Sequence, residues 1–180
     1  MEKIILKPFT VEMITPVYLA WFHDPDVCKY TENFESVWDI NDGICWLNAA
    51  QARGDKVFGI FTGTGKHIGN CAIDNMDKKN SHAGMSFLIG NKDYWGRGIA
   101  VMAGAQLMRI GFETFCLNKM WIGTLITNFG MIRVAAKLGL LCYSILPQEK
   151  YSDGEFVDVV RLSMCRTEYM SRLKETNIDA

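Results

Sequence analysis

A glycine-rich stretch in the middle of the chain, DYWGRGIAVMAG (93–104), has residue types that could bind an anion. It lies between an apolar run that ends at Ile89 and a segment with helical spacing. A turn of this kind presents backbone N–H groups that have no partner within the helix, and the helix dipole adds positive potential. Gly96 and Gly98 allow a phosphate to approach the backbone closely, and Arg97 adds a positive charge. The stretch therefore suits a diphosphate. Glycines that only permit tight packing at a helix start are the alternative.

The spacing of these glycines excludes two common diphosphate loops. A Rossmann fingerprint needs a third glycine at the position of Val101. The segment GTGKH (63–67) contains the Gly-Lys of a Walker A loop, but His67 replaces its Ser or Thr and Ile60 replaces its first glycine. We interpret 63–67 as a hairpin turn.

Length and composition indicate one globular domain over residues 1–180. The chain has 180 residues, of which 49% are apolar, enough for a substantial core. Nineteen basic and twenty acidic residues create no large field for nucleic acid or an anionic membrane. No apolar run approaches the ~20 residues of a membrane span, and the N-terminus does not resemble a signal peptide. These features predict a cytoplasmic protein with neither a nucleic-acid nor a membrane partner.

Metal binding is not expected from the cysteines and histidines. No cysteine pair has CxxC spacing, and no two histidines are spaced as ligands on one helix face. The dispersed cysteines are expected to be buried, reduced thiols. They are Cys28, Cys45, Cys71, Cys116, Cys142 and Cys165.

The apolar periodicity predicts a mixed α/β arrangement. A first strand precedes two helical segments, the first capped by Thr10, and an antiparallel meander then leads into the glycine-rich loop. The expected strands are 4–9, 57–63, 67–74, 85–90, 119–126, 140–146 and 151–164, and the expected helices are 11–22, 36–53, 99–115 and 131–139. The apolar stripe of the second helix is Val37, Ile40, Ile44, Leu47 and Ala50.

The order WGRGIA after SFLIG resembles the acetyl-CoA loop of the GNAT acyltransferases. That loop begins with Gln or Arg and then has two residues, Gly, one residue, and Gly or Ala. Gly98 and Ala100 fit it, and Trp95 takes the first position. Four more segments resemble the family in the same order, at 21–30, 67–90, 127–140 and 153–164. The resemblance is strongest to the ribosomal-protein-alanine (Rim-type) and glycan-locus acetyltransferases. It implies the GNAT fold, with a central, mostly antiparallel sheet splayed at the middle and flanking helices.

The resemblance implies acetyl-CoA as co-substrate and places its binding residues. The backbone of Leu88, Ile89 and Gly90 would pair with the pantetheine arm. Asn128 would hydrogen-bond pantetheine, and Arg133 and Lys137 would lie near the cofactor, unless they only form a solvated helix face. The N–H groups expected to hold the pyrophosphate are those of Trp95, Gly96, Arg97, Gly98, Ile99 and Ala100.

The expected reaction is attack of a primary amine on the thioester, with the enzyme positioning the reactants and moving protons. This chain has Gly84, Met131 and Ala135 where relatives often have a glutamate, a serine and a tyrosine that serve as base and acid. The candidate replacements are Asp74, Asp77, His82 and Tyr143, each of which could instead be a turn, surface or core residue. A catalytically inactive acyl-CoA-binding module is therefore a second hypothesis, and an α/β domain that binds no CoA is a third.

The acceptor is expected to be a small-molecule amine. An acidic, aromatic rim between the first two helices could receive an ammonium group, and tryptophans on those helices could stack on a sugar or pack in the core. The rim consists of Asp24, Asp26, Tyr30, Glu32 and Glu35, and the tryptophans are Trp21, Trp38 and Trp46. A nucleotide-linked amino sugar ranks ahead of a protein N-terminus or a polyamine. Oligomeric state is not encoded in these patterns, and a homodimer is one option.

Overall fold

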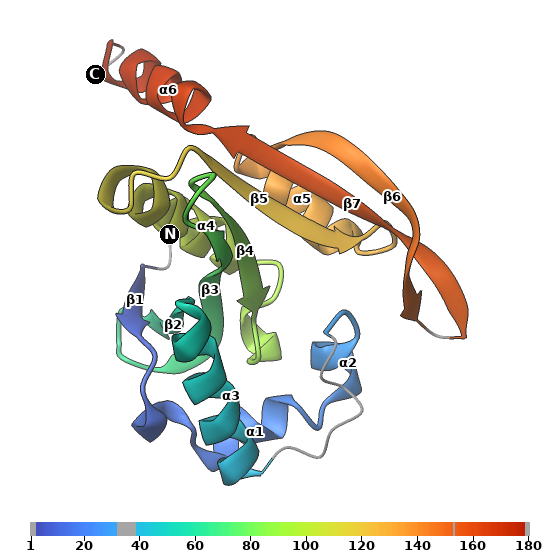
Figure 1. Cartoon of the computed structure of the whole chain (residues 1–180). Coiled ribbons are helices and arrows are strands. Elements are labelled where there is room, and N and C mark those ends of the chain that lie inside the picture. The colour runs from blue at the N-terminus through green and yellow to red at the C-terminus, as the bar shows by residue number, and fades with distance from the viewer. Residues whose placement is uncertain (1–2, 32–38, 153, 179–180) are drawn as a thin grey trace. The chain divides into compact units, whose positions relative to one another are not determined.

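The computed structural model describes residues 3–31, 39–152 and 154–178 (Figure 1). The contacts divide the chain into two compact units. Unit 1 comprises residues 1–75 and 86–103, and unit 2 comprises residues 76–85 and 104–180. Seven strands of the described residues follow the sheet order β1-β2-β3-β4-β5-β7-β6, and helices accompany them. The predicted mixed α/β fold is confirmed.

Unit 1 contains an antiparallel group of strands. β1 (Ile4–Pro8) pairs with β2 (Lys56–Thr62), which pairs with β3 (His67–Asp77) across the short turn that the sequence predicts at 63–66. The register of β2 shifts between Ile60 and Phe61. The helical elements of the unit are η1 (Val11–Met13), α1 (Pro16–Trp21), α2 (Pro25–Cys28), α3 (Ile40–Arg53) and η2 (Lys92–Tyr94), and α4 (Ile99–Arg109) begins here.

The helical segment expected over 11–22 forms two short helices, η1 and α1, with an interruption before Pro16. Thr15 precedes a proline and is therefore extended, so the chain cannot remain helical there. Pro16 occupies the first position of α1, and the Thr15 hydroxyl accepts a hydrogen bond from the Tyr18 N–H at 3.2 Å. Thr10, the expected cap, makes no capping hydrogen bond.

α3 begins with a capping box and ends with a glycine. The Asp39 carboxylate accepts hydrogen bonds from the N–H groups of Asn41 and Asp42, and Asp42 accepts one from the Asp39 N–H. Leu47 and Ala50 are buried as the apolar stripe predicts, whereas Ile40 is 51% exposed because it lies in the first turn. Val37 and Trp38 lie outside the described residues.

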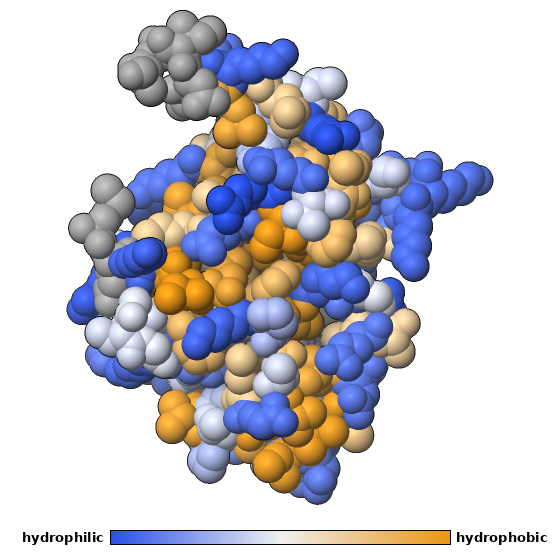
Figure 2. Space-filling view, turned by 90° about the vertical axis from the view of Figure 1, so that its left-hand side faces the viewer, coloured by the Kyte–Doolittle hydropathy of each residue, from blue (hydrophilic) through white to orange (hydrophobic). Residues whose placement is uncertain are grey.

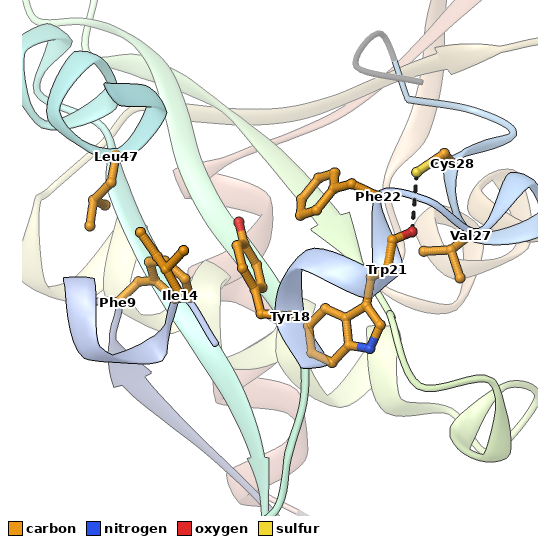
Figure 3. Close-up of a cluster of buried hydrophobic side chains, with 8 residues drawn as sticks. All are labelled: Phe9, Ile14, Tyr18, Trp21, Phe22, Val27, Cys28 and Leu47. Carbon is orange, nitrogen blue, oxygen red and sulfur yellow. Dashed lines mark hydrogen bonds between the residues drawn. The ribbon is translucent and has the colours of Figure 1, made fainter. Parts of the chain in front are cut away.

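A row of aromatic and aliphatic side chains forms the core of unit 1 (Figure 3). Tyr18 lies in the middle of the row, with Phe9, Ile14 and Leu47 on one side and the residues from 21 to 28 on the other. Its ring centroid is 5.1–5.6 Å from those of Phe9, Trp21 and Phe22. The cluster consists of Phe9, Ile14, Tyr18, Trp21, Phe22, Val27, Cys28 and Leu47.

Unit 2 is built on strands that pair in both directions. β4 (His82–Leu88), whose first four residues belong here, runs parallel to β5 (Lys119–Leu125) over His82 to Gly84. β7 (Glu155–Cys165) lies antiparallel between β5 and β6 (Leu141–Ser152). α5 (Phe129–Lys137) contacts β5, and α6 (Arg166–Ile178) contacts β7.

Several expected boundaries differ from the structure. β4 starts at His82 rather than residue 85, and β6 extends to Ser152 rather than residue 146. The helix expected over 99–115 ends at Arg109 and continues as the π-helical turn η3 (Ile110–Thr114). β6 is longer than expected because it pairs with β7 as far as Ser152. The backbone hydrogen bonds between the two strands keep this part of the chain extended.

The cysteine prediction is only partly correct. All six thiols are free, but only Cys28 and Cys71 are buried, and Cys45, Cys116 and Cys142 are exposed. Polar and apolar side chains are interspersed on the face shown in Figure 2. None of the helices in the described ranges is long and apolar enough to cross a membrane.

Candidate functional site

The backbone at Gly96 and Gly98 explains why the loop needs glycine. Their φ angles are +73° and +77°, in the left-handed region that L side chains rarely adopt. A Cβ at either position would meet no atom within 4 Å, so neighbouring atoms do not exclude a side chain there. This geometry contradicts the packing interpretation of these two glycines and leaves their surface open to a ligand.

Trp95 holds the start of the loop through two hydrogen bonds. Its indole N–H donates to the Ile89 carbonyl at 2.7 Å, and its backbone N–H donates to the Lys92 carbonyl at 3.0 Å, where η2 ends. The backbone N–H of Trp95 was expected to bind pyrophosphate, but the structure assigns it to this turn. The N–H groups of Gly96 through Ala100 remain as candidates for the ligand.

The start of α4 has the features of a diphosphate site. Met102 donates its N–H to the Gly98 carbonyl at 3.0 Å, so the N–H groups of Ile99, Ala100 and Val101 precede the first intrahelical bond. The Arg97 guanidinium lies 5.4 Å from the Tyr94 ring centroid. Open glycines, helix-start N–H groups and an arginine fit the pyrophosphate of acetyl-CoA.

The segment that should pair with pantetheine, 88–90, packs tightly in unit 1. A Cβ at Gly90 would overlap the Trp21 ring, so only glycine fits there. The N–H of Asn91 donates to the Ile68 carbonyl at 3.1 Å, which ties the segment to β3. Its pairing with pantetheine stays a prediction.

The other expected cofactor residues lie in unit 2 on α5. Asn128 caps this helix: its side-chain oxygen accepts from the Met131 N–H at 3.1 Å, and its amide donates to the Thr124 hydroxyl at 3.0 Å. Arg133 and Lys137 are exposed and one turn apart. The structure thus gives Asn128 a local role, and contacts of all three with acetyl-CoA remain predictions.

Unit 1 contains a pocket of about 420 Å³, which we call the unit 1 pocket. Aromatic side chains from α1, α3 and β4 surround several carboxylate, amide and hydroxyl groups, a combination typical of small-molecule sites. Its lining residues are Tyr18, Phe22, Tyr30, Thr31, Trp46, Ala50, Arg53, Asp55, Val57, Asn70, Cys71, Ala72, Asp74, Asn75, Ser86, Phe87 and Leu88.

Two carboxylates line the unit 1 pocket in different electrostatic settings. Asp55 is buried and receives two hydrogen bonds from the Arg53 guanidinium, at 2.9 and 3.1 Å. Asp74 is half-buried and accepts a hydrogen bond from the Asn75 amide at 3.0 Å. Burial raises the pKa of Asp74 above its ordinary value, while hydrogen bonds from Ser86 and Asn75 act in the opposite direction. The burial of Asp74 therefore favours its protonated form.

Tyr18 contributes a polar atom to the same pocket. It is fully buried, and its hydroxyl has no hydrogen-bond partner among the described residues. The Asn70 side chain lies near this hydroxyl without completing a hydrogen bond, and instead its Oδ1 is 2.9 Å from Nε2 of His67. Burial raises the pKa of Tyr18, which keeps the phenol neutral at physiological pH. A ligand atom could supply the missing partner.

The expected catalytic residues Asp77, His82 and Tyr143 all lie in unit 2. Asp77 and His82 come together, with Oδ2 and Nε2 3.6 Å apart. Asp77 also accepts hydrogen bonds from the backbone and side chain of Asn80, which lower its pKa. Tyr143 is exposed, and the Lys119 ammonium lies 5.1 Å from its ring centroid. Each residue thus has a local structural contact, and its catalytic role remains a prediction.

The expected acceptor residues lie in different settings in the structure. Asp24 caps α2 and pairs with Lys92 at 2.7 Å, and Asp26 pairs with the same lysine at 3.0 Å, so the two carboxylates of this part of the acidic rim share one ammonium group. Tyr30 lines the unit 1 pocket. Glu32 and Glu35 lie outside the described residues. Trp46 lines the pocket, and Trp21 belongs to the core.

The sequence interpretation missed Tyr18, Asp55, Asn70 and Ser86 as pocket residues. Two periodic signals could have found part of the pocket. Trp46, Ala50 and Arg53 share one face of α3, and Asn70, Ala72 and Asp74 alternate along β3. Polar residues at two of those strand positions, inside an otherwise apolar run, indicate a lined cavity rather than a plain core face.

Comparison with known proteins identifies the class to which this fold and loop belong. The family model described as "Acetyltransferase (GNAT) domain" matches residues 3–141. The chain therefore belongs to the GNAT acetyltransferase family, and it is an acetyl-CoA-dependent N-acyltransferase.

Individual relatives agree with this assignment. The chain is 25% identical over 172 residues to the N-acetyltransferase p20 of Bacillus licheniformis, covering 93% of this chain and 96% of the relative. It shares its fold with spermidine N-acetyltransferase from Vibrio cholerae in complex with CoA and spermine, with a TM-score of 0.82, 15% identity and coverage of 93% and 98%. A probable acetyltransferase is similar at a TM-score of 0.81, with 19% identity and coverage of 92% and 94%.

Proposed function

We propose that this chain acetylates the primary amine of a small molecule and that the amine binds in the unit 1 pocket. The observation that carries the proposal is the lining, in which aromatic rings and the carboxylates of Asp55 and Asp74 face one pocket. Aromatic faces and carboxylates are the groups that bind an ammonium ion. Acetyl-CoA supplies the activated acetyl group, and the loop from Gly96 to Ala100 is proposed to hold its pyrophosphate.

The charges of the lining favour a cationic acceptor over a diphosphate-bearing one. Arg53 is the one cationic side chain among the described lining residues, and its guanidinium is bound to Asp55 at 2.9 Å. A nucleotide-linked amino sugar would bring two phosphate charges that need a cation. We therefore rank a polyamine first and the amino sugar second. The shared fold with a spermidine N-acetyltransferase supports this order.

Finer features of the sequence interpretation stay proposals of the same kind. They are that residues 1–180 form one acetyltransferase domain, that its nearest functional group is the Rim-type or glycan-locus enzymes, that it acts in the cytoplasm, and that it pairs as a homodimer. Rates of acetylation of the different acceptor classes directly test the proposed similarity to the Rim-type or glycan-locus enzymes.

The test is an acceptor screen with the full chain and acetyl-CoA. Thiol release and product mass are measured with spermidine, a nucleotide-linked amino sugar and a peptide with a free N-terminus. We expect acetylated spermidine to form fastest. A chain that binds acetyl-CoA but acetylates none of these amines would contradict the proposal and favour the inactive binding module.

A pair of variants on α3 tests the location of the acceptor. Trp46 and Ile44 are both half-buried and pack against the core cluster, but only Trp46 lines the unit 1 pocket. Trp46→Ala should raise KM for the amine about tenfold, the effect of losing roughly 1.4 kcal/mol of binding, and leave KM for acetyl-CoA unchanged. Ile44→Ala is the matched control for lost packing. Equal KM values for the amine in both variants would argue against this pocket.

A further inference from the structure

We propose that Asp74 is the general base of the transfer, and that its carboxylate takes a proton from the acceptor ammonium group in the unit 1 pocket. This inference rests on the proposed function, because it requires the amine to bind in that pocket. It assigns the base in a chain that has Gly84 where relatives often have a glutamate.

The position of Asp74 suits this role. It lies near the end of β3 and lines the unit 1 pocket together with Asn75 and Ser86. Asn75 adopts a φ of +48°, which interrupts the strand conformation directly after Asp74, and its amide donates to Asp74 Oδ1 at 3.0 Å. An ionised carboxylate has about four acceptor sites. Hydrogen bonds from Asn75 and Ser86 therefore leave capacity for an ammonium N–H.

The surroundings of Asp74 raise its pKa toward the pH at which an enzyme works. Its half-burial raises the pKa of the carboxyl, the Asp55 charge adds to that rise, and the Arg53 charge opposes it. Arg53 and Asp55 form an ion pair at 2.9 Å, so their opposite effects on Asp74 offset each other in part and burial is the main cause of the rise. Tyr18, which lines the pocket from α1, carries no charge near neutral pH because burial raises its pKa. A base works best when its pKa is close to the working pH.

The other carboxylate candidates are less suited to accept a proton. The pKa of Asp77 is lowered by two hydrogen bonds from Asn80, which stabilise its charged form. Asp24 has a lowered pKa for a similar reason, since Lys92 lies 2.7 Å away. Asp74 alone among these three has a raised pKa and lines the pocket.

The step balances with the proposed reactants alone. Asp74 accepts one proton from the ammonium group and becomes a neutral acid. The freed amine nitrogen forms a bond to the thioester carbonyl carbon, and the C–S bond breaks. The amide nitrogen loses its second proton, which the leaving thiolate takes up, and Asp74 returns its proton to solvent.

Steady-state kinetics of Asp74→Asn between pH 5 and 9 test the role. At pH 7 we expect kcat to fall about 10²- to 10⁴-fold, the usual contribution of a general base. The rate of the variant should then rise about tenfold per pH unit, because only the spontaneously neutral amine reacts. Asp74→Glu should restore part of the activity. Asp55→Asn should keep the rise in rate on the acid side of the wild-type pH profile. This rise should occur at lower pH, because removing the Asp55 charge lowers the pKa of Asp74.

A second measurement does not depend on activity. A raised pKa means that the native chain binds a proton more tightly than the unfolded chain, so the contribution of Asp74 to wild-type stability should fall as pH rises through the interval above ~3.9. Asp74→Asn lacks this dependence. The difference in Tm between the two proteins should therefore change between pH 4 and 7 in favour of the variant.

The outcomes distinguish this inference from the proposed function. If wild type acetylates amines and a folded Asp74→Asn variant keeps the wild-type rate and pH profile, Asp74 is not the base and the proposed function stands. A pH-independent difference in Tm would also count against Asp74. If wild type acetylates no amine, both proposals fail.

Discussion

Gly98 shows how one residue can be required by its backbone rather than by its surroundings. Its φ of +77° excludes most side chains, although the space around it is open. Gly65, in the turn between β2 and β3, has the same properties, with a φ of +87° and no atom within 4 Å of an added Cβ. The two positions thus carry equal conformational constraints, but only Gly98 belongs to the proposed acetyl-CoA loop.

Replacing each glycine with tryptophan separates backbone strain from ligand binding. Both Gly98→Trp and Gly65→Trp should lose about 1–2 kcal/mol of stability, the cost of a left-handed L residue. Acetyl-CoA at 100 times its Kd should stabilise wild type and Gly65→Trp by ~2.7 kcal/mol, and Gly98→Trp much less. Thermal unfolding with and without acetyl-CoA measures both effects. Equal stabilisation of the two variants would exclude this loop as the pyrophosphate site.

At the scale of the element, local sequence sets where α3 begins and which face it buries. Asp39 and Asp42 close a capping box, and Leu47 and Ala50 then pack inward while Trp46 reaches the unit 1 pocket. Because Trp46 and Arg53 depend on the direction of this helix, the cap at Asp39 contributes to the geometry of the pocket as well as to stability.

Removing the α3 cap should destabilise the chain measurably. Asp39→Ala loses hydrogen bonds to two helix N–H groups at 2.7 and 3.0 Å and should cost about 0.5–2 kcal/mol. Thr10→Ala is the comparison, because Thr10 precedes η1 without making a cap bond, and it should change stability by less than about 0.5 kcal/mol. Urea unfolding of both variants gives the free energies. A smaller loss for Asp39→Ala than for Thr10→Ala would contradict the capping account.

At the scale of the whole molecule, a half-buried histidine links stability to pH. His67 stacks on Phe61 with ring centroids 4.8 Å apart, and its Nε2 lies 3.0 Å from the Gly69 carbonyl and 2.9 Å from Asn70 Oδ1. Burial lowers the pKa of His67, so the unfolded chain takes up this proton at higher pH than the native chain. The contribution of His67 to the free energy of unfolding is therefore fully present above pH ~6.5, the ordinary pKa of histidine. It is lost as the pH falls from that value toward the lowered pKa of His67 in the native chain.

The free energy of unfolding of wild type should thus fall relative to that of His67→Gln as pH drops from 7.5 to 5.5, because only wild type contains the histidine with the lowered pKa. His23→Gln is the matched control, because it replaces an exposed histidine with the same residue. Chemical unfolding at several pH values provides the comparison. The same slope in His67→Gln as in wild type would show that another group is responsible.

The sequence by itself determined the features that depend on neighbouring residues. Glycines at 96 and 98, the helix that follows and the hairpin turn between β2 and β3 all follow from local backbone preferences, and the structure confirms each. The acetyl-CoA-dependent transferase class could also be predicted, because the loop and four ordered segments together carry the family pattern.

Only the tertiary structure decided which carboxylates share a pocket and which are already paired. Asp74 and Asp77 are three residues apart and look alike in sequence, yet burial raises the pKa of one and hydrogen bonds lower that of the other. Asp24 likewise looked free until Lys92, 68 positions along the chain, was found beside it. Burial and charge pairing depend on residues that meet only after folding, so no local pattern could assign them.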